Sequence, residues 1–432
     1  MPTLSEVERI RALDKAHSWH PFTPMAQWCD PAHDPLVMVS GDGPYLSDSN
    51  GNRYLDGNSS IWTNIHGHRH PTINAAIRDQ LEKIAHVSFL GLTHPLAAEL
   101  GARLCGFFPE STLTRCFFSD DGSTAIEVAL KMSAQFWEMT GEPQRNRFVS
   151  FRSAYHGDTR GAASLGDIPL FRGGLGAQDF PARVSNMKEL SSIDVSNVAA
   201  VVIEPIIQGV AGMRPWPTGM LVALKNWCEF HRIHLILDEV MTGFGRTGKM
   251  FACQHEDVIP DFLCLAKGLT GGYLPMAATL TNETIFRAFQ GDASRTFFYG
   301  HSYTANPLGC AAAMASLDIF EEEKSLETLQ PKIVFLGEKL AELERNHPSI
   351  ATRQCGFVAG IDVPEPSQTR QPRTLSLPGQ STRVCFSARQ FGLLTRPIRD
   401  TVVLMLPLCV SLEQIADAVN ALDSALYEVE SR

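Results

Sequence analysis

Short apolar runs alternate with longer segments of helical periodicity between residues 115 and 237. Four of the runs, rich in β-branched or aromatic residues, predict strands: Arg115–Ser119, 148–151, 199–203 and 234–237. Residues 124–139 and Met220–His231 predict helices, and the second helix lies between two predicted strands. This alternation predicts an α/β fold with a mainly parallel sheet and helices on both faces. Ligands of such sheets bind at the carboxyl ends of the strands, so we look for chemistry there.

The last third of the chain indicates a second, smaller domain of mixed type. Three segments there have helical periodicity: 308–323, 332–344 and 412–429. A polar, proline-bearing stretch at 364–383 predicts a loop between them. We expect this region to close on the first domain.

Composition excludes several classes of partner. The 37 Lys and Arg residues are outnumbered by 47 acidic ones, a net charge of −10, and no basic run occurs, so neither nucleic acid nor an acidic membrane is expected to bind. One of the more apolar stretches, 198–207, is interrupted by Glu204 and Pro205, well short of the ~20 residues of a membrane span. The first 14 residues do not resemble a signal or transit peptide. The ten cysteines include no C-x-x-C pair, which favours free thiols in a reducing cytoplasm.

Two motifs fit known ligand sites only in part. Residues 243–249 fit G-x-G-x-x-G and most of a P-loop, but Met250 stands where a hydroxyl is needed and no strong helix follows. A nucleotide site is therefore disfavoured. His66, His68 and His70 lack a carboxylate or cysteine at metal-ligand spacing, and Gly67 indicates a turn, so a metal site is disfavoured too.

Several chemically useful groups follow predicted strands. Asp238 ends one apolar strand, and Lys267 ends another, where partial desolvation favours the nucleophilic neutral amine. Gly122 and Ser123 open a helix, whose N–H groups and dipole attract anions, and Tyr155 could stack on a flat ligand. Each residue alone has an ordinary alternative: a turn aspartate, a surface lysine or a helix cap. Together they suit pyridoxal phosphate.

Five motifs, in this order and spacing, resemble the class III pyridoxal-phosphate aminotransferases. They are Phe118-Ser-Asp-Asp-Gly-Ser123, Ala154-Tyr-His-Gly-Asp158, Val202-Ile-Glu-Pro205, Leu237-Asp-Glu-Val-Met-Thr-Gly-Phe-Gly-Arg246 and Ala266-Lys-Gly268. Four more are similar to the biotin-pathway branch: Trp19-His-Pro-Phe-Thr23, Asp56-Gly-Asn-Ser-Ser60, Thr93-His-Pro95 and Asn306-Pro-Leu308. Members of that branch aminate 8-amino-7-oxononanoate to 7,8-diaminononanoate, usually with S-adenosylmethionine as donor.

The resemblance implies a role for each strand-end residue. Lys267 would carry the cofactor covalently and move a proton, and Asp238 would pair with the pyridinium nitrogen. Tyr155 would stack on the ring. Gly122 and Ser123 would bind the phosphate, together with Ser302 of the partner subunit.

The substrate residues follow the branch pattern only in part. The resemblance implies that Arg396 binds the substrate carboxylate and that Phe22, Ile61 and Trp62 line the pocket. Phe22 stands where users of S-adenosylmethionine commonly have tyrosine, and Ile61 replaces the first of two tryptophans. We therefore expect S-adenosylmethionine as the donor, with lysine as the alternative. The motifs also include Arg246 and Asp158, at active-site positions without an assigned role.

The resemblance implies a fold-type I transferase that works as a homodimer with shared active sites. The expected division is an N-terminal segment 1–62 in the small domain, a large cofactor-binding domain 63–307 and a C-terminal small domain 308–432. We expect a cytoplasmic enzyme that acts on small molecules and needs no metal. Two alternatives stay open at this point: a class III ω-aminotransferase for another amine, and a cofactor-free binding protein on the same fold.

Overall fold

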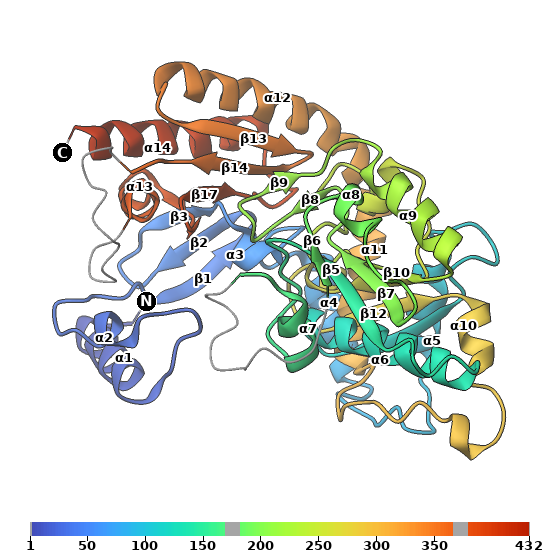
Figure 1. Ribbon diagram of the computed structural model, residues 1–432. Helices are drawn as coiled ribbons and strands as arrows, with labels where there is room; N and C mark the ends of the chain where they lie inside the picture. The colour runs from blue at the N-terminus through green and yellow to red at the C-terminus, as the bar shows by residue number, and fades with distance from the viewer. Residues whose placement is uncertain (1, 169–181, 366–378, 432) are drawn as a thin grey trace.

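A seven-stranded sheet forms the centre of the large domain in the computed structural model, which describes residues 2–168, 182–365 and 379–431 (Figure 1). The strand order is β4-β12-β11-β10-β7-β5-β6. The strands are β4 (Arg115–Ser119), β5 (Arg147–Phe151), β6 (Ala182–Val184), β7 (Val198–Ile203), β10 (His234–Asp238), β11 (Phe262–Leu265) and β12 (Ala277–Thr281). Only β12 runs antiparallel to its neighbours, so the predicted mainly parallel sheet is confirmed.

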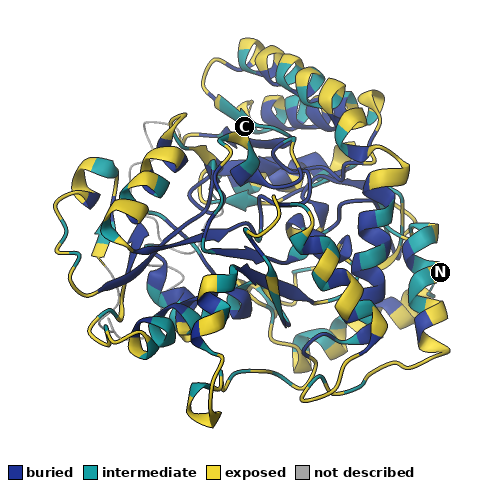
Figure 2. Ribbon diagram, turned by 90° about the vertical axis from the view of Figure 1, so that its right-hand side faces the viewer, coloured by how far each residue is buried: buried dark blue, intermediate teal, exposed yellow. Residues whose placement is uncertain are grey.

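Helices cover both faces of this sheet. The helices around this sheet are α4 (Pro71–Leu81), α5 (Pro95–Cys105), α6 (Gly122–Met139), α7 (Arg160–Leu165), α8 (Met187–Leu190), α9 (Met220–His231), α10 (Glu283–Ala288) and α11 (Pro307–Glu322). In Figure 2 the central strands of the sheet are dark blue, while the outer faces of the helices carry many of the exposed residues. A capping box between Asp121 and Thr124 fixes where α6 begins, directly beyond the end of β4. The helix therefore starts at the carboxyl edge of the sheet.

Both chain ends build the smaller domain. Strands β1 (Met38–Asp42), β2 (Tyr45–Asp48) and β3 (Arg53–Asp56) form a sheet with β15 (Leu393–Leu394), which pairs parallel with β3. The second sheet has the order β13-β14-β17-β16. Its strands are β13 (Ala351–Cys355), β14 (Val358–Asp362), β16 (Pro397–Ile398) and β17 (Thr401–Leu404). The blue and red ribbons lie side by side in Figure 1, which confirms an α+β domain made from both ends.

Helices complete this domain. They are α1 (Leu4–His17), α2 (Met25–Trp28), α12 (Ser325–Asn346), α13 (Gln380–Ala388) and α14 (Leu412–Glu430), and a short pair of strands, β8 (Ile207–Gln208) and β9 (Arg214–Pro215), lies against β13. Among the described residues, no helix combines the length and the apolar character needed to cross a membrane.

Two sequence expectations placed helix boundaries wrongly. The helix expected at 332–344 is α12, which begins at Ser325 and continues through Pro331. Proline commonly marks a helix boundary, yet the buried Leu329 holds the turn before Pro331 against the core. The loop expected at 364–383 gives way to α13 at Gln380, and residues 366–378 of that stretch lie outside the described part of the chain.

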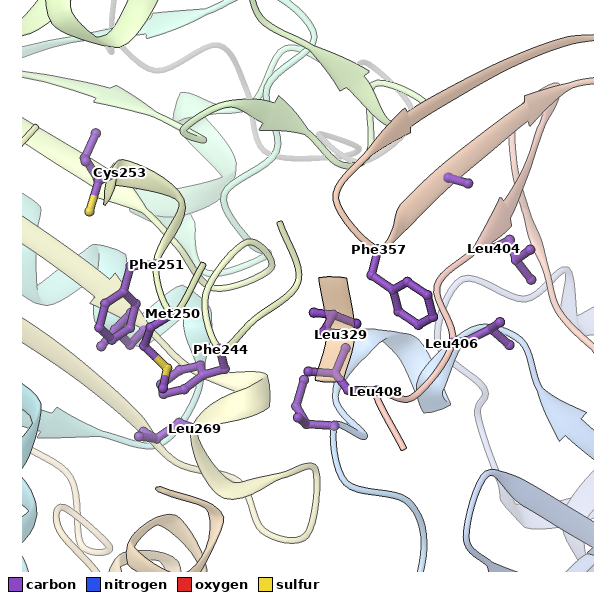
Figure 3. Close-up of a cluster of buried hydrophobic side chains, with 14 of the residues drawn as sticks. Phe244, Met250, Phe251, Cys253, Leu269, Leu329, Phe357, Leu404, Leu406 and Leu408 are labelled. Atoms are coloured by element: carbon purple, nitrogen blue, oxygen red, sulfur yellow. The ribbon is translucent and has the colours of Figure 1, made fainter. Parts of the chain in front are cut away.

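One continuous hydrophobic core joins the two domains (Figure 3). Phe244 and Phe251 of the large domain and Leu406 and Leu408 beyond β17 belong to the same buried cluster. The fully buried Arg246 links the same two regions, because it donates to the carbonyl oxygens of Leu406 at 2.7 Å and Asn64 at 2.9 Å. The domains are thereby fixed relative to each other around the edge of the sheet.

Candidate active site

One cavity of about 550 Å³ opens at the carboxyl edge of the central sheet. Nine of the residues predicted from the sequence line it: Phe22, Ile61, Trp62, Gly122, Ser123, Tyr155, Asp238, Lys267 and Arg396. The tenth, Ser302, is exposed and does not line the cavity of its own chain. The structure therefore brings together residues that are up to 374 positions apart in the sequence.

Asp238 and His156 form a buried pair at the base of the cavity. Asp238 is the last residue of β10, and its Oδ2 accepts a hydrogen bond from His156 Nδ1 at 2.7 Å. Burial disfavours the charged imidazole, but the hydrogen bond and charge of Asp238, helped by Glu204, outweigh it and raise the pKa of His156. Asp238 also caps a turn, since its Oδ1 accepts from the N–H of Val240 at 3.1 Å. Asp238 is therefore a turn residue and also the partner of His156 at the cavity.

Lys267 follows β11 and presents its amine to the cavity. Its Nζ lies 4.7 Å from the centre of the Trp62 ring, and no described carboxylate lies within ion-pair distance of it. Burial lowers the pKa of Lys267 to about 8, although the charges of Asp238 and Glu204 act in the opposite direction. Roughly one amine in ten is then neutral at pH 7, against fewer than one in a thousand for an ordinary lysine. The geometry therefore supplies a nucleophilic amine.

Glu204 is a third ionisable group beside the cavity, and it comes directly after β7. Its Oε1 accepts from the N–H of Gly209 at 2.9 Å and its Oε2 from the N–H of Tyr155 at 3.4 Å. Burial raises its pKa to about 7, and the nearby charge of Asp238 contributes. The sequence patterns predicted no role for either Glu204 or His156. The available signals were the Glu-Pro motif for Glu204 and the position next to Tyr155 for His156. Neither signal indicates which groups these two side chains contact.

The N-terminus of α6 forms the polar end of the cavity. Gly122 and Ser123 are its first two residues, so their N–H groups and the positive end of the helix dipole face the cavity. Ser123 Oγ accepts from the N–H of Asp158 at 3.1 Å. Gly157 packs against it with a φ of +122°, where an added Cβ would come within 2.0 Å of Ser123 Oγ. This corner is shaped to receive an anion.

The opposite end of the cavity is mostly apolar. Phe22 and Ile61 are 56% and 45% exposed, so both walls are open to a ligand, while Trp62 is buried and donates from Nε1 to Asn58 at 2.7 Å. Arg396 lies between β15 and β16 at the mouth of the cavity, exposed and without an ion-pair partner in the described part of the chain. A guanidinium so placed is available for a carboxylate.

Arg246 and Asp158 have structural contacts. Arg246 does not line the cavity but holds backbone carbonyls behind it, and burial lowers its pKa to about 9. Asp158 accepts a hydrogen bond from the hydroxyl of Tyr155 at 2.7 Å, which orients the ring.

The three histidines near residue 68 bond to protein side chains. His66 pairs with Ser316 at 3.0 Å, His68 with Asp56 at 3.0 Å, and His70 with Glu323 at 3.1 Å. The glycine-rich segment 243–249 forms turns that lead to a short 3₁₀ segment, Ala252–His255, rather than to an α-helix. It lacks the strand–loop–helix context of a nucleotide-binding motif.

Comparisons with known proteins agree with this geometry. Residues 26–426 match the sequence profile "Aminotransferase class-III". The sequence is 44% identical to the adenosylmethionine-8-amino-7-oxononanoate aminotransferase of Nitratidesulfovibrio vulgaris. The alignment covers 98% of this chain and 83% of that protein. The sequence is 40% identical to the protein of the same name from Geobacter sulfurreducens, with 98% of both chains covered.

Solved structures give the same result. The adenosylmethionine-8-amino-7-oxononanoate aminotransferase of Methanocaldococcus jannaschii superposes with a TM-score of 0.91 at 37% identity, covering 98% of this chain and 99% of that one. An amine transaminase from an uncultivated Pseudomonas species superposes with a TM-score of 0.88 at 34% identity, covering 95% and 98%.

The geometry predicts how Lys267 titrates. In the cofactor-free protein, acylation of Lys267 by a small reagent, followed by peptide mass spectrometry, should rise with pH and reach half its maximum near pH 8. Asp238→Asn should move that midpoint to lower pH, because it removes a charge that favours the protonated amine. Asp48→Asn, in a separate buried turn, should leave the midpoint unchanged. A midpoint near the ordinary value of 10.5 would contradict the proposed burial of the amine.

Proposed function

This chain belongs to the class-III aminotransferase family, and we propose that it transfers an amino group to 8-amino-7-oxononanoate, giving 7,8-diaminononanoate for biotin biosynthesis. One observation carries the proposal: a single cavity holds a nucleophilic lysine, a buried aspartate–histidine pair and a helix N-terminus. The first two suit imine chemistry with a pyridine cofactor, and the third suits its phosphate.

The residues present fit pyridoxal 5'-phosphate as the cofactor. The buried His156 Nε2 has no hydrogen-bond partner among the described residues, and Nδ1 is tied to Asp238, so this pair is built to face a further polar group. Gly122 and Ser123 would bind the phosphate, Tyr155 would flank the ring, Asp238 would pair with its nitrogen, and Lys267 would hold it covalently. When bound, the cofactor supplies an electron sink for the carbon that carries the amino group.

The protein's own groups would then handle protons and charge. The Nζ of Lys267 takes the proton from the amine-bearing carbon of the donor and returns a proton on the acceptor side. Asp238, itself held by His156, would place its carboxyl group where a protonated ring nitrogen needs a partner. The hydroxyl bond from Tyr155 to Asp158 and the backbone bond from Tyr155 to Glu204 hold the aromatic ring in place.

The shape and charge of the cavity suit the substrate. 8-Amino-7-oxononanoate has a keto group and an amine at one end of an apolar chain and a carboxylate at the other. The reactive end would lie at Lys267, the chain along the walls formed by Ile61 and Trp62, and the carboxylate at the unpaired Arg396. A planar guanidinium can bind that carboxylate bidentately.

We also propose a homodimer with shared sites in the cytoplasm. Ser302 is exposed and lies outside the cavity of its own chain, as expected if it serves the phosphate site of a second copy. The ten cysteines are all free thiols, which suits a reducing compartment.

S-adenosylmethionine is the proposed donor, with lysine as the alternative. Phe22 and Trp62 offer aromatic faces for an adenine ring and for a sulfonium charge. Phe22 lacks the tyrosine hydroxyl, a loss of ~0.5–1.5 kcal/mol, and Ile61 lacks a stacking surface. We expect the pocket to bind this donor more weakly than one with tyrosine and tryptophan at these positions.

Removing the lysine amine tests the proposal. Lys267→Ala should still bind pyridoxal phosphate, because the phosphate and ring contacts remain. It should lose covalent attachment, measured by the protein mass after borohydride reduction, and turnover should fall by more than the ~10²–10⁴-fold typical of acid–base help alone. A Lys267→Ala protein that still attaches the cofactor covalently would contradict the role of this residue.

Replacing the guanidinium tests carboxylate recognition. Arg396→Lys should raise KM for 8-amino-7-oxononanoate by about 10- to 100-fold, because a point charge does not reproduce a bidentate pair worth ~1.5–3 kcal/mol. The control is a ketone of the same length without the carboxylate, whose KM should not change. If Arg396→Lys leaves KM for the keto acid unchanged, the carboxylate binds elsewhere.

The donor can be identified by single-turnover transfer to the bound cofactor, followed by absorbance at matched donor concentrations. The unmodified protein should react faster with S-adenosylmethionine than with lysine. The double variant Phe22→Tyr, Ile61→Trp should react faster still with S-adenosylmethionine, because it gains a stacking surface and a hydroxyl. If the unmodified protein reacts with lysine and not with S-adenosylmethionine, lysine is the donor and the proposed choice of S-adenosylmethionine is wrong.

A further inference from the structure

Four consecutive residues, the last two of which line the cavity, have a left-handed backbone. These are the residues of α3 (Ser59–Trp62), with φ values of +43°, +49°, +65° and +68° in chain order. None is glycine, although a side chain crowds the following carbonyl in this conformation. Such residues normally occur singly, so a run of four that includes a β-branched isoleucine must be held by its surroundings.

Backbone bonds close the run into one helical turn of the opposite hand. The N–H of Trp62 donates to Asn58 at 2.8 Å, and the N–H groups of Thr63 and Asn64 both donate to Ser59 at 2.9 Å. These bonds satisfy three N–H groups and the carbonyl groups of Asn58 and Ser59. They do not choose the hand of the turn, because a right-handed turn forms the same type of bond at lower steric cost.

Asp56 supplies one of the contacts that hold the left-handed form, and Ser59 supplies another by donating from Oγ to the carbonyl oxygen of Met405 at 2.6 Å. Asp56 is the last residue of β3, buried, and outside the cavity lining. Its Oδ1 accepts from the N–H of Ser60 at 2.9 Å, and its Oδ2 accepts from the Ser60 hydroxyl at 2.7 Å and from His68 Nε2 at 3.0 Å. The carboxylate therefore accepts hydrogen bonds from both the N–H and the hydroxyl of Ser60, inside the strained run. His68 in addition bonds to the carboxylate and fixes its position.

The hand of this turn decides which side chains line this part of the cavity. Ile61 and Trp62 both line the cavity, and the Trp62 ring lies 4.7 Å from Lys267 Nζ. Reversing the hand would redirect every Cα–Cβ bond in the turn. The two side chains would leave the wall even though the sequence was unchanged.

We propose that Asp56 is a positioning residue for substrate binding, which it controls by holding the left-handed turn that carries Ile61 and Trp62. The effect on substrate rests on the function proposed above, whereas the effect on the turn does not. A turn that is native in only a fraction of molecules reduces apparent affinity by that fraction and leaves the saturated rate nearly unchanged.

The first test uses hydrogen exchange in the cofactor-free protein. Asp56→Asn should speed exchange of the amides of Trp62, Thr63 and Asn64 by roughly tenfold, the factor expected from losing a charge-assisted bond. Asp48→Asn is the matched control: Asp48 is also buried in the small domain and also caps a turn, by accepting from the N–H groups of Asn50 and Asn52. It should leave the exchange of those three amides unchanged.

The second test reads the hand of the turn directly. Ser60→Gly and Ser60→Ala remove the same hydroxyl, and Ser60 is exposed and outside the cavity lining. In a right-handed turn alanine is the more stable residue, whereas at a φ of +49° glycine is favoured. Ser60→Gly should therefore have the higher melting temperature of the two. A higher melting temperature for Ser60→Ala would overturn the proposal, even if Asp56→Asn does not fold.

The third test connects the turn to substrate. Asp56→Asn should raise KM for 8-amino-7-oxononanoate by roughly tenfold and change kcat by less than about threefold. Adding Ser60→Gly should recover part of the KM, and adding Ser60→Ala should not. An equal rise in KM for Asp56→Asn and Asp48→Asn would show a merely structural role. If the unmodified protein does not turn over this keto acid, the proposed function fails. The hydrogen-exchange rates and the melting temperatures then still decide whether Asp56 holds the turn.

Discussion

The Lys267 amine lies near two carboxyl groups that are committed to other partners. Asp238 is tied to His156 and to the N–H of Val240, and Glu204 accepts from two backbone N–H groups. Neither carboxyl is free to swing onto the lysine and form a close ion pair, which would stabilise the ammonium form. Burial then dominates and leaves a reactive amine at a pKa of about 8. Nucleophilic chemistry at this site depends on that balance.

The parallel sheet makes this arrangement from distant parts of the chain. Glu204 follows β7, Asp238 ends β10 and Lys267 follows β11; these three strands are neighbours in the sheet, and Tyr155 and His156 follow β5. The chemistry thus rests on rigid strand ends. The walls come from elsewhere: Phe22, Ile61 and Trp62 from the first 62 residues and Arg396 from the last 40. Substrate choice can therefore change through these walls while the strand ends stay fixed.

Sequence patterns predicted the strand-end residues because each follows an apolar run whose period and length indicate a buried strand. They missed the pairing of His156 with Asp238, since the two residues are 82 positions apart and only the fold brings them together. They also missed the left-handed turn at 59–62, because Ser, Ile and Trp carry no signal for a positive φ and the cause, Asp56, acts through tertiary contacts. The assigned roles of the cavity residues and the domain boundaries stay predictions.

Isotope transfer measures the proposed reaction most directly. The protein would be incubated with pyridoxal phosphate, unlabelled 8-amino-7-oxononanoate and S-adenosylmethionine labelled with ¹⁵N at its amino group, with labelled lysine in a parallel reaction. We predict that the 7,8-diaminononanoate formed carries one ¹⁵N at carbon 7 and its original nitrogen at carbon 8. A product without label, or no diamine with either donor, would contradict it.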